Sequence, residues 1–117
     1  MADKWDGELC MCMRRMPRLR KMLSKEKITE NVKTLKLAAH PTRLQILKVL
    51  SECDVCVCIL SELLGKSQPN ISQHLSKLKD NGLIESYHKG KYVYYRISDR
   101  QAAGMMKALN QLPVRGS

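Results

Sequence analysis

Apolar residues recur at helical spacing after the first 25 residues of the chain. Their period of three to four residues predicts a helix over residues 26–39 with one apolar face. That face consists of Ile28, Val32, Leu35 and Ala39. Pro41 suits the first turn of a second helix, whose inner stripe consists of Leu44, Leu47 and Leu50. We expect this second helix to lie at the centre of the core.

Two shorter helices follow, separated by a tight turn. Residues 56–64 predict a helix that ends at Gly65, because glycine readily adopts the left-handed conformation of a C-cap. Ser67 or Gln68 can cap the next helix, which tolerates Pro69 in its first turn. The inner stripe of that helix consists of Ile71, Leu75 and Leu78.

A hairpin and a last helix complete the pattern. Residues 83–88 and 92–97 are rich in β-branched and aromatic side chains, and Lys89-Gly90-Lys91 joins them with a basic tip. Asp99 can cap a helix that extends to residue 112. The order of core helix, helix pair and hairpin predicts a mainly α fold with a β-hairpin wing, the winged helix-turn-helix.

The chain divides into three parts on this pattern. Residues 1–25 mix cysteine, methionine and basic residues, and Pro17 is expected to interrupt any helix there, so we predict a flexible basic arm. We expect residues 26–112 to form the DNA-binding and dimerisation domain that a winged helix-turn-helix implies, and residues 113–117 to form a C-terminal tail. A chain of 117 residues leaves no room for a second core of any size.

Charge favours a polyanionic partner. The 21 Lys and Arg residues outnumber the 11 Asp and Glu residues, which gives a net charge of +10. A solvated basic surface and an anionic membrane are the alternatives. The sequence contains no apolar run of the roughly 18 residues that a membrane span needs, and its first residues do not resemble a signal peptide. We therefore expect a cytoplasmic protein without a membrane partner.

The second short helix carries polar side chains suited to reading DNA. If its apolar stripe faces the core, Gln73, Ser76 and Lys77 point outward, with Asn70 and Ser72 on the flanks. His74 lies at the edge of the stripe, where a half-buried structural histidine is the competing interpretation. The predicted DNA-binding residues are Lys66, Ser67, Gln68, Asn70, Ser72, Gln73, Ser76, Lys77, His88, Lys89 and Lys91. A merely solvated polar face is the alternative for this helix.

A homodimer follows from the length of DNA that one helix can read. A single recognition helix reads few base pairs, so specific repressors commonly bind two half-sites of an imperfect palindrome in double-stranded DNA. The helices at 26–39 and 99–112 have apolar faces available, and pairing them across a twofold axis would bury those faces.

Five cysteines form two groups: Cys10 and Cys12, then Cys53, Cys56 and Cys58. Their odd number and clustering favour reduced thiols over a disulfide framework. If the chain is helical there, Cys56 and Cys58 point about 200° apart, so binding one ion would open the first turn of the helix. Cys53 lies on the side of Cys56 if that helix extends to it. Three thiolates suit arsenite or antimonite, and the arm cysteines would make a set that suits cadmium, lead or zinc.

Four motifs together resemble the ArsR/SmtB family of metal- and metalloid-responsive repressors. They are His40-Pro41-Thr42-Arg43-Leu44-Gln45-Ile46-Leu47, Cys56-Val57-Cys58, Ser67-Gln68-Pro69-Asn70-Ile71-Ser72-Gln73-His74-Leu75 and Gly82-Leu83-Ile84. The resemblance implies a dimeric repressor that leaves its operator when an inducer binds. It favours As(III) or Sb(III) as inducer, then Cd(II), Pb(II) or Zn(II), and no organic cofactor. The zinc site that some members carry on the last helix is expected to be absent, since no histidine follows His88.

Two other functions use the same residues. The first is a redox-sensing repressor, in which an arm cysteine and one of the later cysteines form a disulfide or a persulfide. The second is a metal-binding carrier protein whose basic surface serves solubility. An enzyme is not expected, because no nucleophile and base, phosphate loop or carboxylate set has a usable spacing.

Overall fold

The computed structural model describes residues 13–115 of the chain. Two compact units are distinguished, residues 1–33 and residues 34–117. The described part of the first unit contains helix α2 (Met16–Met22) and the beginning of helix α3 (Lys25–Ala38). No helix within residues 13–115 is long and apolar enough to cross a membrane.

A helix boundary lies where Pro17 was expected to interrupt any helix in the arm. Residues 13 and 14 are helical, Arg15 is a turn residue, and α2 begins at Met16 with Pro17 in its first turn. Proline is tolerated at that position, where its missing N–H has no helical partner in any case. Arg20 and Lys21 occupy the last turn, where positive charge interacts favourably with the helix dipole.

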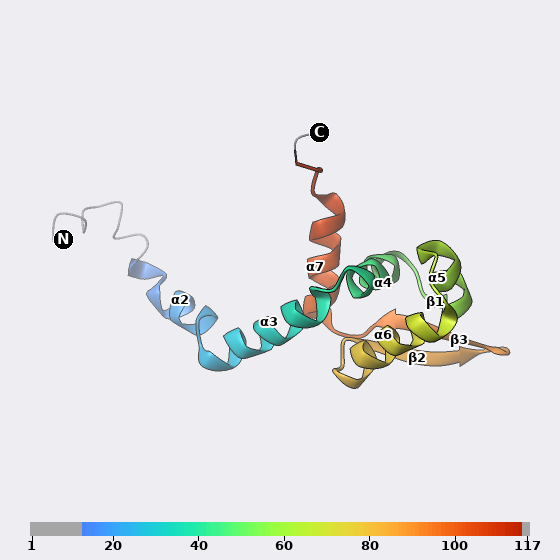
Figure 1. The fold of residues 1–117 in the computed structure, drawn as a ribbon. Coiled ribbons are helices and arrows are strands. Elements are labelled where there is room, and N and C mark those ends of the chain that lie inside the picture. The colour runs from blue at the N-terminus through green and yellow to red at the C-terminus, as the bar shows by residue number, and fades with distance from the viewer. Residues whose placement is uncertain (1–12, 116–117) are drawn as a thin grey trace. The chain divides into compact units, whose positions relative to one another are not determined.

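The second unit has the predicted winged helix-turn-helix order (Figure 1). Its elements are α4 (Pro41–Glu52), β1 (Val55–Cys56), α5 (Val57–Leu64), α6 (Gln68–Asp80), β2 (Ile84–Lys89), β3 (Tyr92–Ile97) and α7 (Arg100–Gln111). The strands form one antiparallel sheet in the order β1-β3-β2. The prediction of a mainly α fold with a β-hairpin wing is confirmed.

Local side chains determine where several helices begin and end. The imidazole Nδ1 of His40 accepts the Thr42 N–H at the start of α4, and Ser67 Oγ accepts the Asn70 N–H at the start of α6. Asp99 caps α7 in the same way. Gly65, with a φ of 65°, forms the predicted left-handed C-cap of α5.

The core of this unit is aliphatic. Helix α4 contributes Ile46, Leu47 and Leu50, whereas Leu44, predicted for the inner stripe, is only half-buried. The stripe of α6 is buried as predicted. The other buried apolar side chains include Leu60, Leu83, Ile84, Ala102 and Met106. This core fixes α5, α6 and the base of the hairpin against α4, and so positions the surfaces described next.

Candidate functional site

Helix α6 presents a continuous polar face. Ile71, Leu75 and Leu78 are at most 1% exposed, so the other positions of the helix, except the half-buried His74, point away from the core. The predicted DNA-reading residues on this face are all exposed: Asn70, Ser72, Gln73, Ser76 and Lys77. We call α6 the recognition helix. Lys66, Ser67 and Gln68 are exposed at its N-terminal end, and Ser67 also serves as the N-cap.

His74 is half-buried, which agrees with its interpretation as a structural side chain. Its ring lies against that of His40, with the two centroids 4.6 Å apart. Burial lowers the pKa of His74, and the nearby His40, Arg43 and Lys66 lower it further. His74 thus links the recognition helix to the start of α4 and remains largely neutral near pH 7.

The wing formed by β2 and β3 ends in a basic tip. His88, Lys89 and Lys91 are exposed there, around Gly90 with its positive φ of 64°, and the tip projects beyond the helices in Figure 1. Arg96 lies lower on the wing, where its Nε donates to Glu85 at 2.6 Å and its guanidinium lies over the Tyr87 ring. Arg96 is also exposed but is paired with Glu85, whereas the tip brings three exposed basic side chains close together.

The sulfurs of Cys56 and Cys58 lie much closer together than the sequence indicated. Cys56 Sγ and Cys58 Sγ are 3.5 Å apart. The expectation that the two side chains diverge by about 200° is wrong, because it assumed a helical Cys56. Cys56 is instead the last residue of β1 and the N-cap of α5, with an extended backbone (φ −95°, ψ 170°). The pair is thus assembled without opening a turn of helix.

Cys53 lies apart from this pair. It is the exposed C-cap of α4, with an extended backbone, so the expectation that one helix carries Cys53 and Cys56 on the same side is wrong. Within residues 13–115, no three His, Cys, Asp or Glu side chains are arranged to hold a metal ion. The other two predicted ligands, Cys10 and Cys12, lie outside the described residues. We call residues 53–58 the thiol junction.

The two thiols of the pair differ in acidity. The pKa of Cys56 is lowered, mainly because the backbone N–H of Ile59 donates to its sulfur, and this effect exceeds the opposing effect of burial. The pKa of Cys58 is raised, mainly because its thiol donates to Cys56. Cys56 therefore ionises first, and a thiolate is the form that attacks electrophiles and binds soft metals.

A cleft of about 290 Å³ opens beside the pair. It is lined by Asp54, Val55, Cys56, Cys58, Ile59, Tyr92 and Tyr94. Strand pairing brings Tyr94 into the lining of the cleft beside Cys56, because the two residues lie opposite each other in the register of β1 and β3. Tyr92, two residues along β3, lies on the same face as Tyr94.

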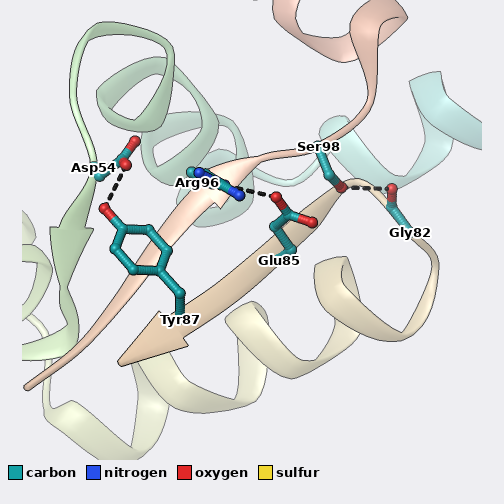
Figure 2. A network of polar contacts seen from close by, with 6 residues as sticks. All are labelled: Asp54, Gly82, Glu85, Tyr87, Arg96 and Ser98. Carbon is teal, nitrogen blue, oxygen red and sulfur yellow. Dashed lines mark hydrogen bonds and ion pairs between the residues drawn. The ribbon is translucent and has the colours of Figure 1, made fainter. Parts of the chain in front are cut away.

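A second contact ties the thiol junction to the wing. The Tyr87 hydroxyl on β2 donates to the Asp54 carboxylate at 2.5 Å, as Figure 2 shows, and the Tyr87 ring stacks on Tyr94. The Asp54 carboxylate raises the pKa of Tyr87, so the hydroxyl keeps its proton. Sequence patterns missed this contact and β1, because a two-residue strand has no periodicity to detect. Asp54, a polar residue directly before Val55, was the only local sequence feature that could have indicated a polar contact at this position.

Apolar side chains remain exposed on the helices predicted to form the dimer interface. On α3 they are Ile28, Val32 and Leu35, and at the end of α7 they are Leu109 and Leu112. Each of the five is between 37% and 64% exposed in the single chain. Such positions suit burial against a second copy.

Comparison with known proteins identifies the family. Residues 40–86 match the family described as bacterial regulatory protein, arsR family. The chain is 40% identical over 81 residues to the arsenical resistance operon repressor of Escherichia coli K12, which covers 68% of this chain and 69% of that protein. This chain belongs to the ArsR family. It is also 32% identical over 91 residues to a cadmium resistance transcriptional regulatory protein, a CadC homolog of Staphylococcus aureus, covering 77% of this chain and 75% of that protein.

Solved structures agree with this membership. The regulator HlyU from Vibrio vulnificus matches with a TM-score of 0.74 and 32% identity, covering 83% of this chain and 99% of HlyU. The homodimeric winged helix-turn-helix domain of Mb0332 from Mycobacterium bovis matches with a TM-score of 0.63 and 29% identity. The match covers 74% of this chain and 81% of that domain's chain. The protein is therefore a DNA-binding transcriptional repressor of the ArsR family and not an enzyme. The Mb0332 domain, one of its structural neighbours, is homodimeric.

Proposed function

We propose that this ArsR-family repressor releases its operator when a thiophilic metalloid or metal binds Cys56 and Cys58. As(III) and Sb(III) are the first candidates, and Cd(II), Pb(II) and Zn(II) follow. The observation that carries the proposal is the 3.5 Å distance between the two sulfurs, at the start of the first helix of the helix-turn-helix. Paired soft thiolates are the donors that these elements prefer.

Additional thiols would complete the coordination in this proposal. Cys53 is three residues from Cys56 in the sequence, in the same thiol junction, and would be the third ligand for arsenite or antimonite after a local movement of the α4 C-terminus. Cys10 and Cys12 would bring the total to the four thiolates that cadmium, lead or zinc favour. These arm cysteines would act within one subunit or across the dimer.

The route from the thiols to DNA runs through the thiol junction. Cys56 is paired with Tyr94 of the wing, and Cys58 lies in the first turn of α5, which packs on the recognition helix. A ligand bound to both sulfurs changes the constraint on both the wing and α5. DNA then leaves because it has lower affinity for the liganded arrangement, which is the differential affinity that such a switch requires.

The DNA contacts proposed are those of the recognition helix and the wing tip. Gln73 and Asn70 suit adenine edges, Ser72 and Ser76 suit bases or phosphates, and the cations suit phosphates. The cations are Lys66, Lys77, Lys89 and Lys91, with His88 beside them. Dimerisation through α3 and α7 would place two recognition helices on successive half-sites.

The test is operator release by reduced protein. A DNA fragment that the protein selects from a random pool serves as operator, and fluorescence anisotropy reports binding before and after arsenite or cadmium is added. We expect release by at least one of the two ions. Cys56→Ser and Cys58→Ser should each retain DNA affinity and abolish release, because each leaves a single thiol in the pair.

Two results would contradict this function. Retained release in both serine variants would remove the thiols from the mechanism, and release by peroxide alone would assign the switch to redox chemistry. Cys53→Ser is the matched variant, since it removes the third thiol of the thiol junction and leaves Cys56 and Cys58 in place. A loss of arsenite response in Cys53→Ser would identify the third ligand.

A further inference from the structure

A strongly basic segment of the chain has no role in the sites described above. Residues 14–25 contain six cations and no carboxylate. We infer that this basic segment binds the phosphates of the DNA that flanks each operator half-site, and so adds a second, sequence-independent contact to that of the recognition helix. This contact needs neither the thiols nor an inducer.

The cations of the basic segment are available to an anionic partner. All six are exposed, and within residues 13–115 none of them forms an ion pair, whereas Arg96 pairs with Glu85 at 2.6 Å. Binding a phosphate therefore breaks no ion pair in this part of the protein, and the counterions that DNA releases favour the contact. The six cations are Arg14, Arg15, Arg18, Arg20, Lys21 and Lys25.

Helix α2 concentrates part of this charge on one face. Arg18 and Lys21 lie three residues apart in α2, so their side chains are neighbours on the helix surface. Like charges at this spacing weaken a helix, and the first turn of α2 contains no acidic residue to offset them. A phosphate bound between the two side chains would remove this repulsion. Four of the six cations are arginines, whose guanidinium groups can donate two parallel hydrogen bonds to a phosphate.

The chain itself brings the basic segment to DNA. The winged helix-turn-helix binds the operator, and it is connected to the basic segment by α3, a helix of 14 residues and therefore roughly 21 Å in length. One turn of DNA measures about 34 Å. A tether shorter than that turn keeps flanking phosphates at a high effective concentration around the basic segment.

An anionic membrane is the other polyanionic surface that a basic segment of this kind can meet. Met22 and Leu23 are exposed beside the cations, and an interfacial helix also has apolar side chains next to basic ones. Helix α2 has only seven residues, however, and residues 13–25 contain none of the aromatic side chains that commonly insert at a membrane interface. These features favour DNA, and vesicle binding becomes an outcome of the test.

The first test compares two DNA fragments in the absence of inducer. One is the selected operator trimmed to its two half-sites, and the other carries about one further helical turn of unrelated sequence on each side. The unchanged protein should bind the longer fragment more tightly. With about two to four phosphate contacts, this advantage should shrink roughly 10- to 150-fold between 50 and 200 mM salt. Equal affinity for the two fragments at the lower salt concentration would overturn the inference.

An arginine variant then assigns the advantage to the basic segment. It is Arg14→Gln/Arg15→Gln/Arg18→Gln/Arg20→Gln. Glutamine has a helix propensity close to that of arginine and the replaced side chains are exposed, so the variant should fold normally, which circular dichroism checks. It should bind both fragments with nearly equal affinity. A variant that kept the full advantage of the longer fragment would contradict the inference.

A charge-matched control separates a local contact from the loss of net charge. It removes four exposed cations outside the basic segment: Lys33→Gln/Lys36→Gln/Arg100→Gln/Lys107→Gln. This control should keep the advantage of the longer fragment. Loss of the advantage in the control as well would show that total charge, and not the basic segment, produces it.

Two further measurements decide between DNA and a membrane. Hydroxyl-radical footprinting should show protection of the flanking DNA by the unchanged protein and loss of that protection in the arginine variant. If vesicles of phosphatidylcholine and phosphatidylserine bind the unchanged protein but not the arginine variant, and flanking DNA adds no affinity, the basic segment is a membrane surface and the inference fails. A failure of arsenite to release DNA from the unchanged protein would overturn the proposed function and leave this inference standing.

Discussion

The recognition helix and the thiol junction are neighbours in the same unit, yet different parts of the sequence determine them. The helix depends on its own residues: Ser67 caps it, and a stripe of three aliphatic side chains sets which face is buried. The junction depends on distant partners, because Tyr94 pairs with Cys56 and Tyr87 donates to Asp54 from 33 residues away. The surface for DNA is thus locally encoded, and the site for the inducer is built by the wing.

This difference has a functional consequence. Substitutions on the recognition helix should change DNA affinity and leave thiol chemistry alone, because no side chain of the DNA-reading face lines the cleft. Substitutions that loosen the wing from the thiol junction should change the response to inducer and leave the basal affinity for DNA nearly intact.

The largest effect is expected for Gln73→Ala on the recognition helix. Loss of a bidentate contact to a base costs about 1–3 kcal/mol, so operator affinity should fall roughly 5- to 150-fold. Anisotropy titrations at one fixed salt concentration measure it. Gln45→Ala, which removes the same exposed side chain from α4, is the control and should bind normally. Arsenite capture by Gln73→Ala should be unchanged, and a variant that lost capture would break the separation of the two regions.

A smaller effect is expected for Tyr87→Phe in the wing. The change removes the hydroxyl that donates to Asp54 and leaves the ring stacked on Tyr94, so the free energy of unfolding should fall by about 1 kcal/mol or less. The concentration of inducer needed for half-release should shift by up to roughly tenfold, since the junction is less firmly tied to the wing. Basal operator affinity should stay within about twofold of normal.

Tyr92→Phe is the matched control for that substitution, because it removes a hydroxyl from a neighbouring tyrosine that, in the described part of the chain, forms no hydrogen bond with Asp54. Denaturant unfolding and operator release should both be normal in this control. Identical behaviour of the two variants would show that the Asp54 contact does not link the wing to the sensing site.

The same contrast explains what could be predicted from the sequence. Caps and apolar stripes are local signals, and Ser67, Gly65 and Asp99 begin or end their helices as expected. The short strand β1 could not be predicted, because Val55 and Cys56 become a strand only by pairing with β3. Because Cys56 was expected to lie inside a helix, the direction of its thiol relative to Cys58 was predicted wrongly.

Pro17 shows a related limit. A proline in the interior of a helix breaks it, whereas a proline in the first turn is tolerated. Its effect therefore depends on where the helix begins. In α2 the first turn falls on Pro17 itself, although neither Arg15 nor Met16 supplies the Ser, Thr, Asp or Asn that usually signals a helix start. The division into residues 1–25, 26–112 and 113–117 remains a prediction.

Hydrogen exchange with and without arsenite tests most directly whether the thiol junction transmits ligand binding to the wing. We predict changed exchange in peptides that cover residues 53–60 and β3, with unchanged exchange in the middle of the recognition helix. We expect no change in Cys56→Ser. Changes confined to α3 and α7, or changes that persist in Cys56→Ser, would contradict the claim that Cys56 and Cys58 form the sensing site.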